Sequence, residues 1–449
     1  RSTRCASPLP SAHHPATETG GMPVVAETLY LGIDVGTSGC RCCLIDAAAT
    51  IRAEASTPLP APARNGAAIE QDPDCWWTAL TTNLDRLHAQ HALASVAAIA
   101  LDGTSSTLLC CDAHGAPLGP ALMYNDARAS REAQRVADIA PAECAAHGAS
   151  ASLAKLLWLL QAPAGRDARH VLHQADWLLG RLCGQFGNSD ENNALKLGYD
   201  ILERCWPEWL QSLDVPLALL PRVVPAGHPI GTLAPQWAER WGLSRDTRIL
   251  AGTTDSTASF IATGAGPGDA VTALGSTLVL KVLASQPLFA PDYGIYSHRL
   301  GNDWLVGGAS NSGGALLQAC FTAEEIERFA ALINIDVPTG LDYYPLVASG
   351  ERFPVNDPAL RPRLQPRPAD DVLFYQGILE GIAAIECRGY RRLAELGAPW
   401  PSRIITTGGG AANAPWRTIR SRVTGVPVTA AVHQQAAYGA ALLALKGSP

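Results

Sequence analysis

Residues 29–41 read Leu-Tyr-Leu-Gly-Ile-Asp-Val-Gly-Thr-Ser-Gly-Cys-Arg, and this stretch decides the fold of the chain. An apolar strand runs directly into a carboxylate, Asp34, and then into a turn of small residues. Such a turn brings backbone N–H groups and hydroxyls close to phosphate oxygens, and a carboxylate at the strand end can hold a hydrated Mg²⁺. The stretch predicts a phosphate-handling loop, although the same small residues also form ordinary hairpin turns.

A second turn of the same kind occurs much later in the chain. Residues 270–274 alternate apolar and small side chains, Gly275-Ser276-Thr277 follows, and an apolar strand resumes at Leu278. Two phosphate turns in two halves of one chain are what a duplicated nucleotide-binding fold needs. We therefore expect one hairpin from each lobe to close on the same triphosphate.

Length and composition exclude several classes of protein. The chain has 449 residues, of which 47% are apolar, and this fits two domains of roughly 200 residues with sizeable cores. A formal net charge of -7 and the lack of a dense Lys/Arg run argue against a nucleic-acid partner. No apolar stretch approaches the roughly 20 residues that a membrane-spanning helix needs. Small molecules are the expected partners.

The twelve cysteines do not form a metal-binding pattern. Two pairs are adjacent in apparent strands, at positions 42–43 and 110–111, so the members of each pair point to opposite faces. No Cys-x-x-Cys is matched by a second pair, which argues against a structural zinc site. Buried, reduced thiols in a reducing compartment are the expectation.

The first residues of the chain, 1–27, have the composition of a targeting segment. They contain Arg, Ser, Thr, Ala, His and Pro, with no acidic residue before Glu18, and they lack the apolar core of a secretory signal. This composition favours the remnant of an organelle transit peptide, and an untargeted, disordered tail is the alternative.

Polar clusters follow several predicted strands. Residues 96–101 end at Asp102-Gly-Thr-Ser-Ser106-Thr107, at the carboxyl end of a strand, where open α/β sheets gather ligands. This cluster predicts contacts to a polyol, or else a capped turn between strands 96–101 and 108–112. Asp126 lies in a Met-Tyr-Asn-Asp-Ala-Arg run that could bind sugar hydroxyls or cap the next helix. Between the first hairpin and residue 96 we expect two helical segments, one opening at Pro73 and one over residues 81–91.

The second half of the chain repeats the theme. Gly252-Thr-Thr-Asp255 ends a strand and opens a helix, so Asp255 is either a functional carboxylate or an N-cap. Two Gly-rich turns precede helices, at residues 307–314 and 404–413. Three consecutive glycines in the second turn leave room for a nucleotide base and ribose against the backbone.

With these motifs in order, the chain resembles the FGGY carbohydrate kinases, members of the actin-like ATPase superfamily, from about residue 29 to residue 445. The matching segments are Asp34-x-Gly36-Thr37 with Arg41 for the first phosphate motif, Gly252-x-x-Asp255 for the catalytic Asp motif, Gly275-Ser276-Thr277 for the second phosphate motif, and Gly408-Gly409-Gly410 with Asn413 and Trp416 for the adenosine motif. One such match would be weak evidence, but four in the family's order are specific.

The resemblance implies an α/β protein with the two-lobed actin-like ATPase (ribonuclease H-like) fold, in which duplicated mixed-sheet domains enclose a central cleft. It implies an N-terminal lobe over residues 28–252, which binds sugar and phosphate. A C-terminal lobe over residues 253–449 would bind ATP.

Within the family, the runs at residues 102–107, 192–200 and 252–256 look most like the plant and cyanobacterial D-ribulose kinases. Xylulokinases and glycerol kinases usually carry a Gln-x-His-Gly segment where this chain has the Asp102 run. The implied reaction is phosphorylation of D-ribulose to D-ribulose 5-phosphate, with xylulose or another polyol as the alternative substrate. Gln434 and Gln435 replace the acidic residue common in the family's last helix motif. Together with residues 1–27, this likeness suggests a chloroplast stroma location, with the cytoplasm as the alternative.

The resemblance also implies roles for individual residues. Asp255 would be the general base, and Asp34 would hold the water shell of Mg²⁺, with Asp255 nearby as a second metal contact. The implied substrate-binding residues are Asp34, Ser38, Gly39, Cys40, Arg41, Asp102, Ser106, Asp126 and Asp255. The implied ATP-binding residues are Gly36, Thr37, Ser276, Thr277, Ser312, Gly313, Gly410, Ala411 and Asn413.

A second class of function shares the two-lobed core. Chaperone-like and actin-like proteins bind nucleotide without phosphorylating sugars, so a nucleotide-binding regulatory protein is the alternative to a kinase. The sequence offers no appended peptide-binding domain, and both Asp34 and Asp255 are retained. These features favour the enzyme.

Overall fold

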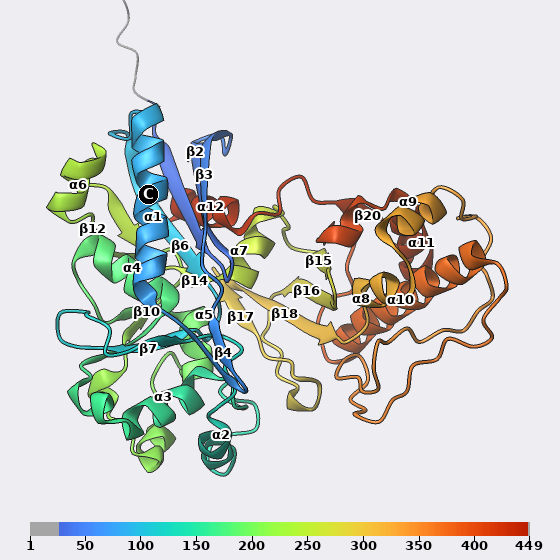
Figure 1. The fold of residues 1–449 in the computed structure, drawn as a ribbon, viewed down its shortest axis with the longest axis horizontal. Coiled ribbons are helices and arrows are strands. Elements are labelled where there is room, and N and C mark those ends of the chain that lie inside the picture. Colours follow the sequence, from blue (N-terminus) through green and yellow to red (C-terminus); the bar gives the residue numbers. More distant parts are fainter. Residues whose placement is uncertain (1–26, 448–449) are drawn as a thin grey trace, which may run out of the picture.

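A computed structural model describes residues 27–447 of the chain. These residues form two lobes, each built around a mixed β-sheet, with the blue and green segments in one lobe and most of the yellow to red segments in the other (Figure 1). No helix within the described residues is long and apolar enough to cross a membrane. The predicted targeting segment lies outside the described residues except for Glu27.

The sheet of the first lobe runs in the order β12-β13-β6-β1-β2-β3, and β14 pairs with β6 beside β13. Antiparallel pairing joins β1 to β2 and β2 to β3, whereas β6 is parallel to β1, and β13 and β14 are parallel to β6. Its strands are β1 (Leu29–Val35), β2 (Gly39–Asp46), β3 (Ile51–Pro58), β6 (Val96–Gly103), β12 (Pro229–Thr232), β13 (Arg248–Leu250) and β14 (Thr253–Thr254).

The sheet of the second lobe repeats this arrangement, in the order β17-β18-β16-β15-β19-β20. The strands β18-β16-β15-β19-β20 correspond in order and direction to β3-β2-β1-β6-β13 of the first sheet. Its strands are β15 (Asp269–Leu274), β16 (Leu278–Ala284), β17 (His298–Leu300), β18 (Asp303–Ser310), β19 (Arg403–Thr407) and β20 (Val428–Ala430). The repeat confirms the predicted fold of duplicated mixed-sheet domains.

Two smaller sheets complete the first lobe. One runs in the order β4-β5-β8-β7-β9 and the other joins β10 to β11. Their bounds are β4 (Ala63–Asn65), β5 (Ala68–Gln71), β7 (Leu108–Cys111), β8 (Ala121–Leu122), β9 (His170–His173), β10 (Asn188–Asp190) and β11 (Arg222–Val224).

The helices cover the faces of these sheets. Their bounds are α1 (Pro73–Gln90), α2 (Ser130–Ala137), α3 (Ser152–Gln161), α4 (Gln174–Cys183), α5 (Glu191–Ala194), α6 (Pro235–Trp241), α7 (Asp255–Ala262), α8 (Gly314–Cys320), α9 (Ala323–Ala330), α10 (Asp371–Glu395), α11 (Ala414–Thr424) and α12 (Ala436–Lys446). The prediction of two helical segments before residue 96 was wrong, because α1 is a single helix over Pro73–Gln90. Asp72 caps its N-terminus by accepting from the Asp74 N–H at 3.0 Å, and no Gly or Pro interrupts it after Pro73.

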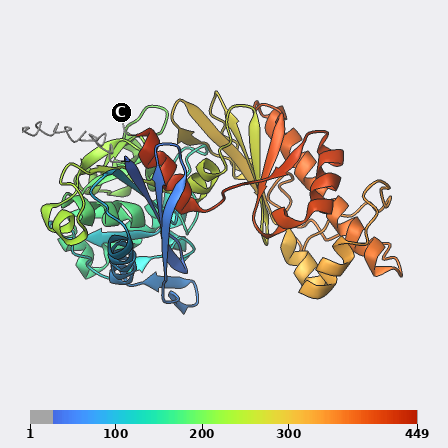
Figure 2. The ribbon, with the colours of Figure 1, turned by 90° about the horizontal axis from the view of Figure 1, so that it is seen from above.

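The last helix returns to the first lobe, as both ribbon views show (Figures 1 and 2). There α12 packs against β1 and α7. Two glycines allow this approach, because a Cβ on Gly32 would lie 2.0 Å from the Ala437 carbonyl oxygen and one on Gly439 would lie 1.9 Å from the Ala258 carbonyl oxygen. The first lobe therefore contains α7 and α12 in addition to residues before position 252. The domain boundary expected at 252/253 stays a prediction.

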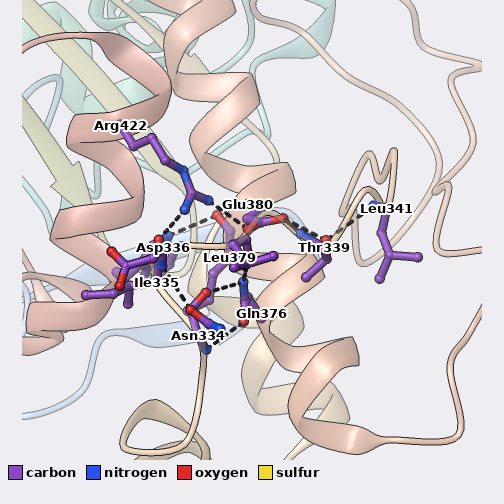
Figure 3. A network of polar contacts seen from close by, with 11 residues as sticks. Asn334, Ile335, Asp336, Thr339, Leu341, Gln376, Leu379, Glu380 and Arg422 are labelled. Carbon is purple, nitrogen blue, oxygen red and sulfur yellow. Dashed lines mark hydrogen bonds and ion pairs between the residues drawn. The ribbon is translucent and has the colours of Figure 1, made fainter.

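A polar network fixes the outer part of the second lobe, where the segment after α9 lies against α10 and α11 (Figure 3). Glu380 of α10 accepts from the Thr339 hydroxyl at 2.6 Å and from Arg422 of α11 at 2.8 Å. Gln376 exchanges two hydrogen bonds with the backbone of Asn334, at 3.0 and 2.8 Å. These contacts replace regular secondary structure in positioning this segment.

Candidate active site

Three carboxylates meet at the carboxyl ends of adjacent parallel strands. Asp34 of β1 is paired in register with Asp102 of β6, and Asp102 is paired with Thr253 of β14. Asp255 follows two residues later, as the first residue of α7. The parallel strands thus bring together three acidic residues that are far apart in the sequence.

Burial changes the charge state of this cluster. Burial, followed by the neighbouring charges of Asp34 and Asp255, raises the pKa of Asp102 far above its usual range. Burial also raises the pKa of Asp34, while the neighbouring Asp102 carboxyl and the Arg41 guanidinium act to lower it. A guanidinium nitrogen of Arg41 lies 3.2 Å from a carboxylate oxygen of Asp34. Two neighbouring buried carboxyl groups do not both stay ionised, and Asp102, whose pKa is raised further, is the member that holds the proton. Neither oxygen of Asp102 has a hydrogen-bond partner among the described residues.

Asp255 is partly buried and does not act as an N-cap. The capping position belongs to Thr254, and the Asp255 carboxylate accepts a hydrogen bond from the Ser256 N–H at 2.6 Å. Burial raises the pKa of Asp255 to about 6, the Ser256 N–H opposes this rise, and the Asp34 charge adds to it. A carboxylate that titrates near neutral pH is suited to accept a proton from an alcohol.

The first phosphate loop is a tight turn between β1 and β2. The Gly36 N–H donates to the Gly39 carbonyl at 3.0 Å, Thr37 is half-buried and Ser38 is exposed. Cys40 is fully buried in the apolar core beneath α1, because neighbours along a strand alternate between faces and Arg41 takes the face of Asp34. This geometry argues against the substrate contact expected for the Cys40 side chain.

The second phosphate loop is braced by the start of α8. The Gly314 N–H donates to the Gly275 carbonyl at 2.8 Å, and a Cβ on Gly313 would lie 2.6 Å from the Ser276 carbonyl oxygen. Ser276 is exposed and Thr277 half-buried, so both are open to a ligand. Ser312 is buried and its hydroxyl donates to the Pro345 carbonyl at 2.5 Å, which leaves it little capacity to bind ATP directly.

A cavity of about 820 Å³ lies between α7 of the first lobe and the second sheet. Its lining residues are Ser256, Ser259, Phe260, Val271, Ala273, Val279, Lys281, Thr407, Gly408, Gly409, Ala411, Ala412, Arg417, Ala430, Ala431, Gln434 and Gln435. The charged members of this lining are both cations, Lys281 and Arg417. A cavity with cations and no carboxylate is suited to a polyanion such as a triphosphate.

The predicted adenosine residues divide between the cavity and the framework around it. Ala411 lines the cavity, whereas Gly410 packs against Leu274, whose side chain would lie 2.4 Å from a Cβ at that position. Asn413 caps α11 by accepting from the Trp416 N–H at 2.9 Å, and its amide donates to Tyr375 at 2.9 Å. Asn413 therefore holds the loop in shape.

Sequence reasoning missed several residues of the lining, namely Lys281, Thr407, Arg417, Gln434 and Gln435. Lys281 carried a signal, because it is a lone charge in the apolar strand Leu-Val-Leu-Lys-Val-Leu-Ala. Gln434 was noted only as a departure from the family, and its side-chain oxygen accepts from the Gly408 N–H at 3.1 Å.

Unpartnered polar atoms occur in the segments near Asp102. The Ser106 hydroxyl and the Asn125 side-chain oxygen are buried without a hydrogen-bond partner among the described residues. Ser106 also adopts φ of 69°, a left-handed conformation that is costly for a residue other than glycine. The buried ammonium of Lys155 holds this loop by donating to the Ser106 and Met123 carbonyls at 2.8 and 2.7 Å. Buried polar atoms without partners indicate a polar ligand.

Asp126 is occupied by other contacts. Its carboxylate accepts from the Ile69 N–H at 2.6 Å and from the Arg128 guanidinium at 2.6 Å. It does not cap α2, whose N-cap is Ala129. This arrangement favours a framework role for Asp126 over direct sugar binding.

The donor set is compatible with Mg²⁺. No group of three or more His, Cys, Asp or Glu side chains within residues 27–447 is placed to form a protein-only metal site. Mg²⁺ commonly keeps several waters and takes one or two carboxylates together with substrate phosphates. Asp34 and Asp255 supply that kind of donor.

Comparisons with known proteins agree with this geometry. Residues 29–262 match the model for the N-terminal domain of the FGGY family of carbohydrate kinases, and residues 270–448 match the model for its C-terminal domain. The xylulose kinase of Escherichia coli K12 is 25% identical over 416 residues, covering 88% of this chain and 85% of that protein.

Solved structures give the same fold. A xyloylose kinase from Brucella ovis superposes with a TM-score of 0.85 at 26% identity, covering 94% of this chain and 91% of that one. A gluconate kinase from Lactobacillus acidophilus superposes with a TM-score of 0.82 at 20% identity, covering 94% and 89%.

Proposed function

Since the chain belongs to the FGGY family of carbohydrate kinases, we propose that it phosphorylates a ketopentose with ATP, and that D-ribulose is its substrate and D-ribulose 5-phosphate its product. One observation carries the proposal. The carboxylates of Asp34, Asp102 and Asp255 lie side by side at strand ends, and Ser256, next to Asp255, lines the cavity suited to a polyanion.

Phosphoryl transfer requires mainly positioning and charge stabilisation from the protein. Asp255 accepts the proton of the sugar's terminal hydroxyl as its oxygen forms a bond to the γ-phosphorus. The bond from that phosphorus to the β–γ bridging oxygen breaks, and its electron pair leaves with ADP. A pKa of about 6 for Asp255 supports this role, because the carboxylate is mostly ionised at neutral pH yet basic enough to take the proton.

The two phosphate turns face this reaction from the two lobes. Thr37 and Ser38 of the first turn, and Ser276 and Thr277 of the second, present hydroxyls that are not fully buried. Closure of the lobes on a bound sugar excludes water, which would otherwise accept the phosphoryl group. Asp34 and Asp255 would hold Mg²⁺, which neutralises phosphate charge when it enters with ATP.

The sugar contacts are proposed on the first-lobe side of the carboxylates. Asp102 and Ser106 offer buried polar atoms without partners, and a sugar hydroxyl would satisfy them. The likeness of the Asp102 run to D-ribulose kinases favours D-ribulose. D-xylulose is the second candidate, because several curated relatives at 25–28% identity are named xylulose kinases.

The test is a substrate panel. ADP release from Mg²⁺-ATP is measured with D-ribulose, L-ribulose, D-xylulose, glycerol and no sugar, and each product is identified by mass and by ³¹P NMR. We expect the highest kcat/KM with D-ribulose. A higher kcat/KM with D-xylulose or glycerol would keep the kinase and overturn the proposed sugar.

A further inference from the structure

Lys281 is the one charged residue of β16, and its side chain reaches across to the other lobe. Its ammonium donates a hydrogen bond of 2.7 Å to the carbonyl oxygen of Ser256, in the first turn of α7. Lys281 and Ser256 both line the 820 Å³ cavity. The ammonium therefore lies beside the proposed base, Asp255, on the side where the triphosphate is expected (Figure 1 shows β16 beside α7).

This ammonium is poorly compensated by the protein. An ammonium has three donors, and the Ser256 carbonyl is its one acceptor among the described residues. No carboxylate within residues 27–447 lies at ion-pair distance from it. Burial lowers the pKa of Lys281 to about 8, although the negative charge of Asp255 acts to raise it. A desolvated cation with free donors beside a cavity calls for an anionic ligand.

The neighbouring groups do not supply that anion. Asp255 on α7 is a negative neighbour of Lys281. Lys196, in the short helix η2 (Leu195–Leu197) that follows α5, adds a second positive charge near Asp255 and His298. His298 of β17 is neutral, since burial and the two lysines lower its pKa to about 3. Asp255 is thus the one negative group among these three neighbours, and it makes no ion pair with Lys281.

The choice of lysine is itself informative. Only four of the 34 basic residues of the chain are lysines, and the rest are arginines. Lys155 is buried, Lys196 and Lys281 are partly buried, and Lys446 is exposed. An ammonium is a compact point charge with three donors, whereas a guanidinium is a planar fork, so arginine replaces lysine only in part at a phosphate site. Lys281 lies between strand β16 and the first turn of α7, with its ammonium on the Ser256 carbonyl.

We propose that Lys281 binds the β- and γ-phosphates of ATP and stabilises the negative charge that develops on departing ADP. The proposal rests on the proposed function for its catalytic part. As the bond from the γ-phosphorus to the bridging oxygen breaks, the electron pair stays on that oxygen, and an adjacent ammonium lowers the energy of this state. Without nucleotide, the same ammonium is held in place by the Ser256 carbonyl.

The first experiment measures binding without sugar. Calorimetry compares AMP, ADP and a non-hydrolysable ATP analogue on wild type, Lys281→Met, Lys281→Arg and the exposed control Lys446→Met. We expect Lys281→Met to lower affinity for the ATP analogue about 10- to 100-fold, for ADP less, and for AMP not at all. Lys281→Arg should recover part of the loss, and Lys446→Met should match wild type.

The second experiment measures turnover of the best sugar by the same proteins. Lys281→Met should lower kcat about 100-fold with the KM for sugar nearly unchanged. Unchanged affinity for the ATP analogue, or an equal loss for AMP, ADP and the analogue, would overturn the proposal even if kcat fell, because either result describes a structural contact between lobes. The two proposals can fail separately. If Lys281→Met loses affinity most for the ATP analogue, less for ADP and not for AMP, but wild type phosphorylates no sugar, the proposed function fails and the assignment of Lys281 to the phosphates stands.

Discussion

Asp34 and Asp102 occupy paired positions on the neighbouring parallel strands β1 and β6, and both carboxyl groups are buried at the carboxyl ends of these strands. Asp34 has Arg41 as a partner at 3.2 Å, whereas neither oxygen of Asp102 has a hydrogen-bond partner among the described residues. Such a pair is costly to fold and is retained where a ligand uses it. Asp102 should therefore lower the stability of the folded protein while it contributes to sugar binding.

Replacing Asp102 should therefore stabilise the protein and weaken sugar binding. Asp102→Asn removes one of three neighbouring acidic groups with little change in shape, so we expect the Tm to rise by a few degrees. The KM for sugar should rise about 10-fold or more, because the buried hydrogen-bonding pattern changes. Calorimetry and initial rates measure the two effects, with the exposed Glu239→Gln on α6 as the control. A lower Tm for Asp102→Asn would contradict the electrostatic account.

The three consecutive glycines should respond differently to alanine. Gly408 has φ of 81° and its Cβ would lie 2.7 Å from the Leu274 carbonyl oxygen, so Gly408→Ala should cost more than about 1 kcal/mol in the free energy of unfolding. Gly410→Ala meets the movable Leu274 side chain at 2.4 Å and should cost less. Gly409 has open space at its Cβ position and serves as the matched control. Equal losses at all three positions, measured by denaturant unfolding, would contradict these contacts.

Ser106 combines backbone strain with an unpartnered hydroxyl, and two variants separate them. Ser106→Gly relieves the positive φ and should raise stability by up to about 1 kcal/mol, whereas Ser106→Ala keeps the strain. Both variants lose the hydroxyl and should raise the KM for sugar by a similar factor, about 10-fold. The KM for ATP should not change. A KM for sugar that stays at the wild-type value in both variants would remove Ser106 from the sugar site.

Lys155 should make stability depend on pH in the neutral to weakly alkaline range. Burial lowers the pKa of Lys155 to about 7 in the folded state, compared with its ordinary value of 10.5. Between these values the unfolded chain binds more protons than the folded one, so this lysine makes the free energy of unfolding rise with pH. Relative to Lys155→Met, wild type should gain about 1 kcal/mol per pH unit from pH 7 to 9, and nothing below pH 6. Parallel unfolding curves for the two proteins would contradict the shift.

The sequence was sufficient for the parts of the fold that local patterns encode. Apolar strands that end in Asp34, Asp102 and Gly275 predicted both sheets, because period-two patterns and small-residue turns are local signals. The duplicated fold was expected from the two turns and from the family resemblance, and the matching sheets confirm it. The return of α12 to the first lobe had no local signal, since it depends on the close approach of Gly439 to α7.

The functions of single side chains were harder to predict, because their partners are distant in sequence. Ser312 is held by Pro345, and Asn413 by Tyr375, so hydroxyl and amide groups expected at the nucleotide are engaged in the framework. Lys281 was not predicted as a site residue, because the group that places its ammonium at the cavity, the Ser256 carbonyl, belongs to the other lobe. Pairings of this kind follow from tertiary structure and not from residue type or spacing.

The most direct test of the central claim compares ADP release by wild type and Asp255→Asn, with and without D-ribulose, after both proteins have been shown to bind the ATP analogue equally. We expect sugar-dependent turnover by wild type and a loss of about 10²- to 10⁴-fold in kcat for the variant, because the proton acceptor is absent. Sugar-dependent turnover at the same rate in Asp255→Asn would contradict its role as the base. ATP binding without any sugar-dependent turnover by wild type would contradict the kinase itself and favour a nucleotide-binding regulatory protein.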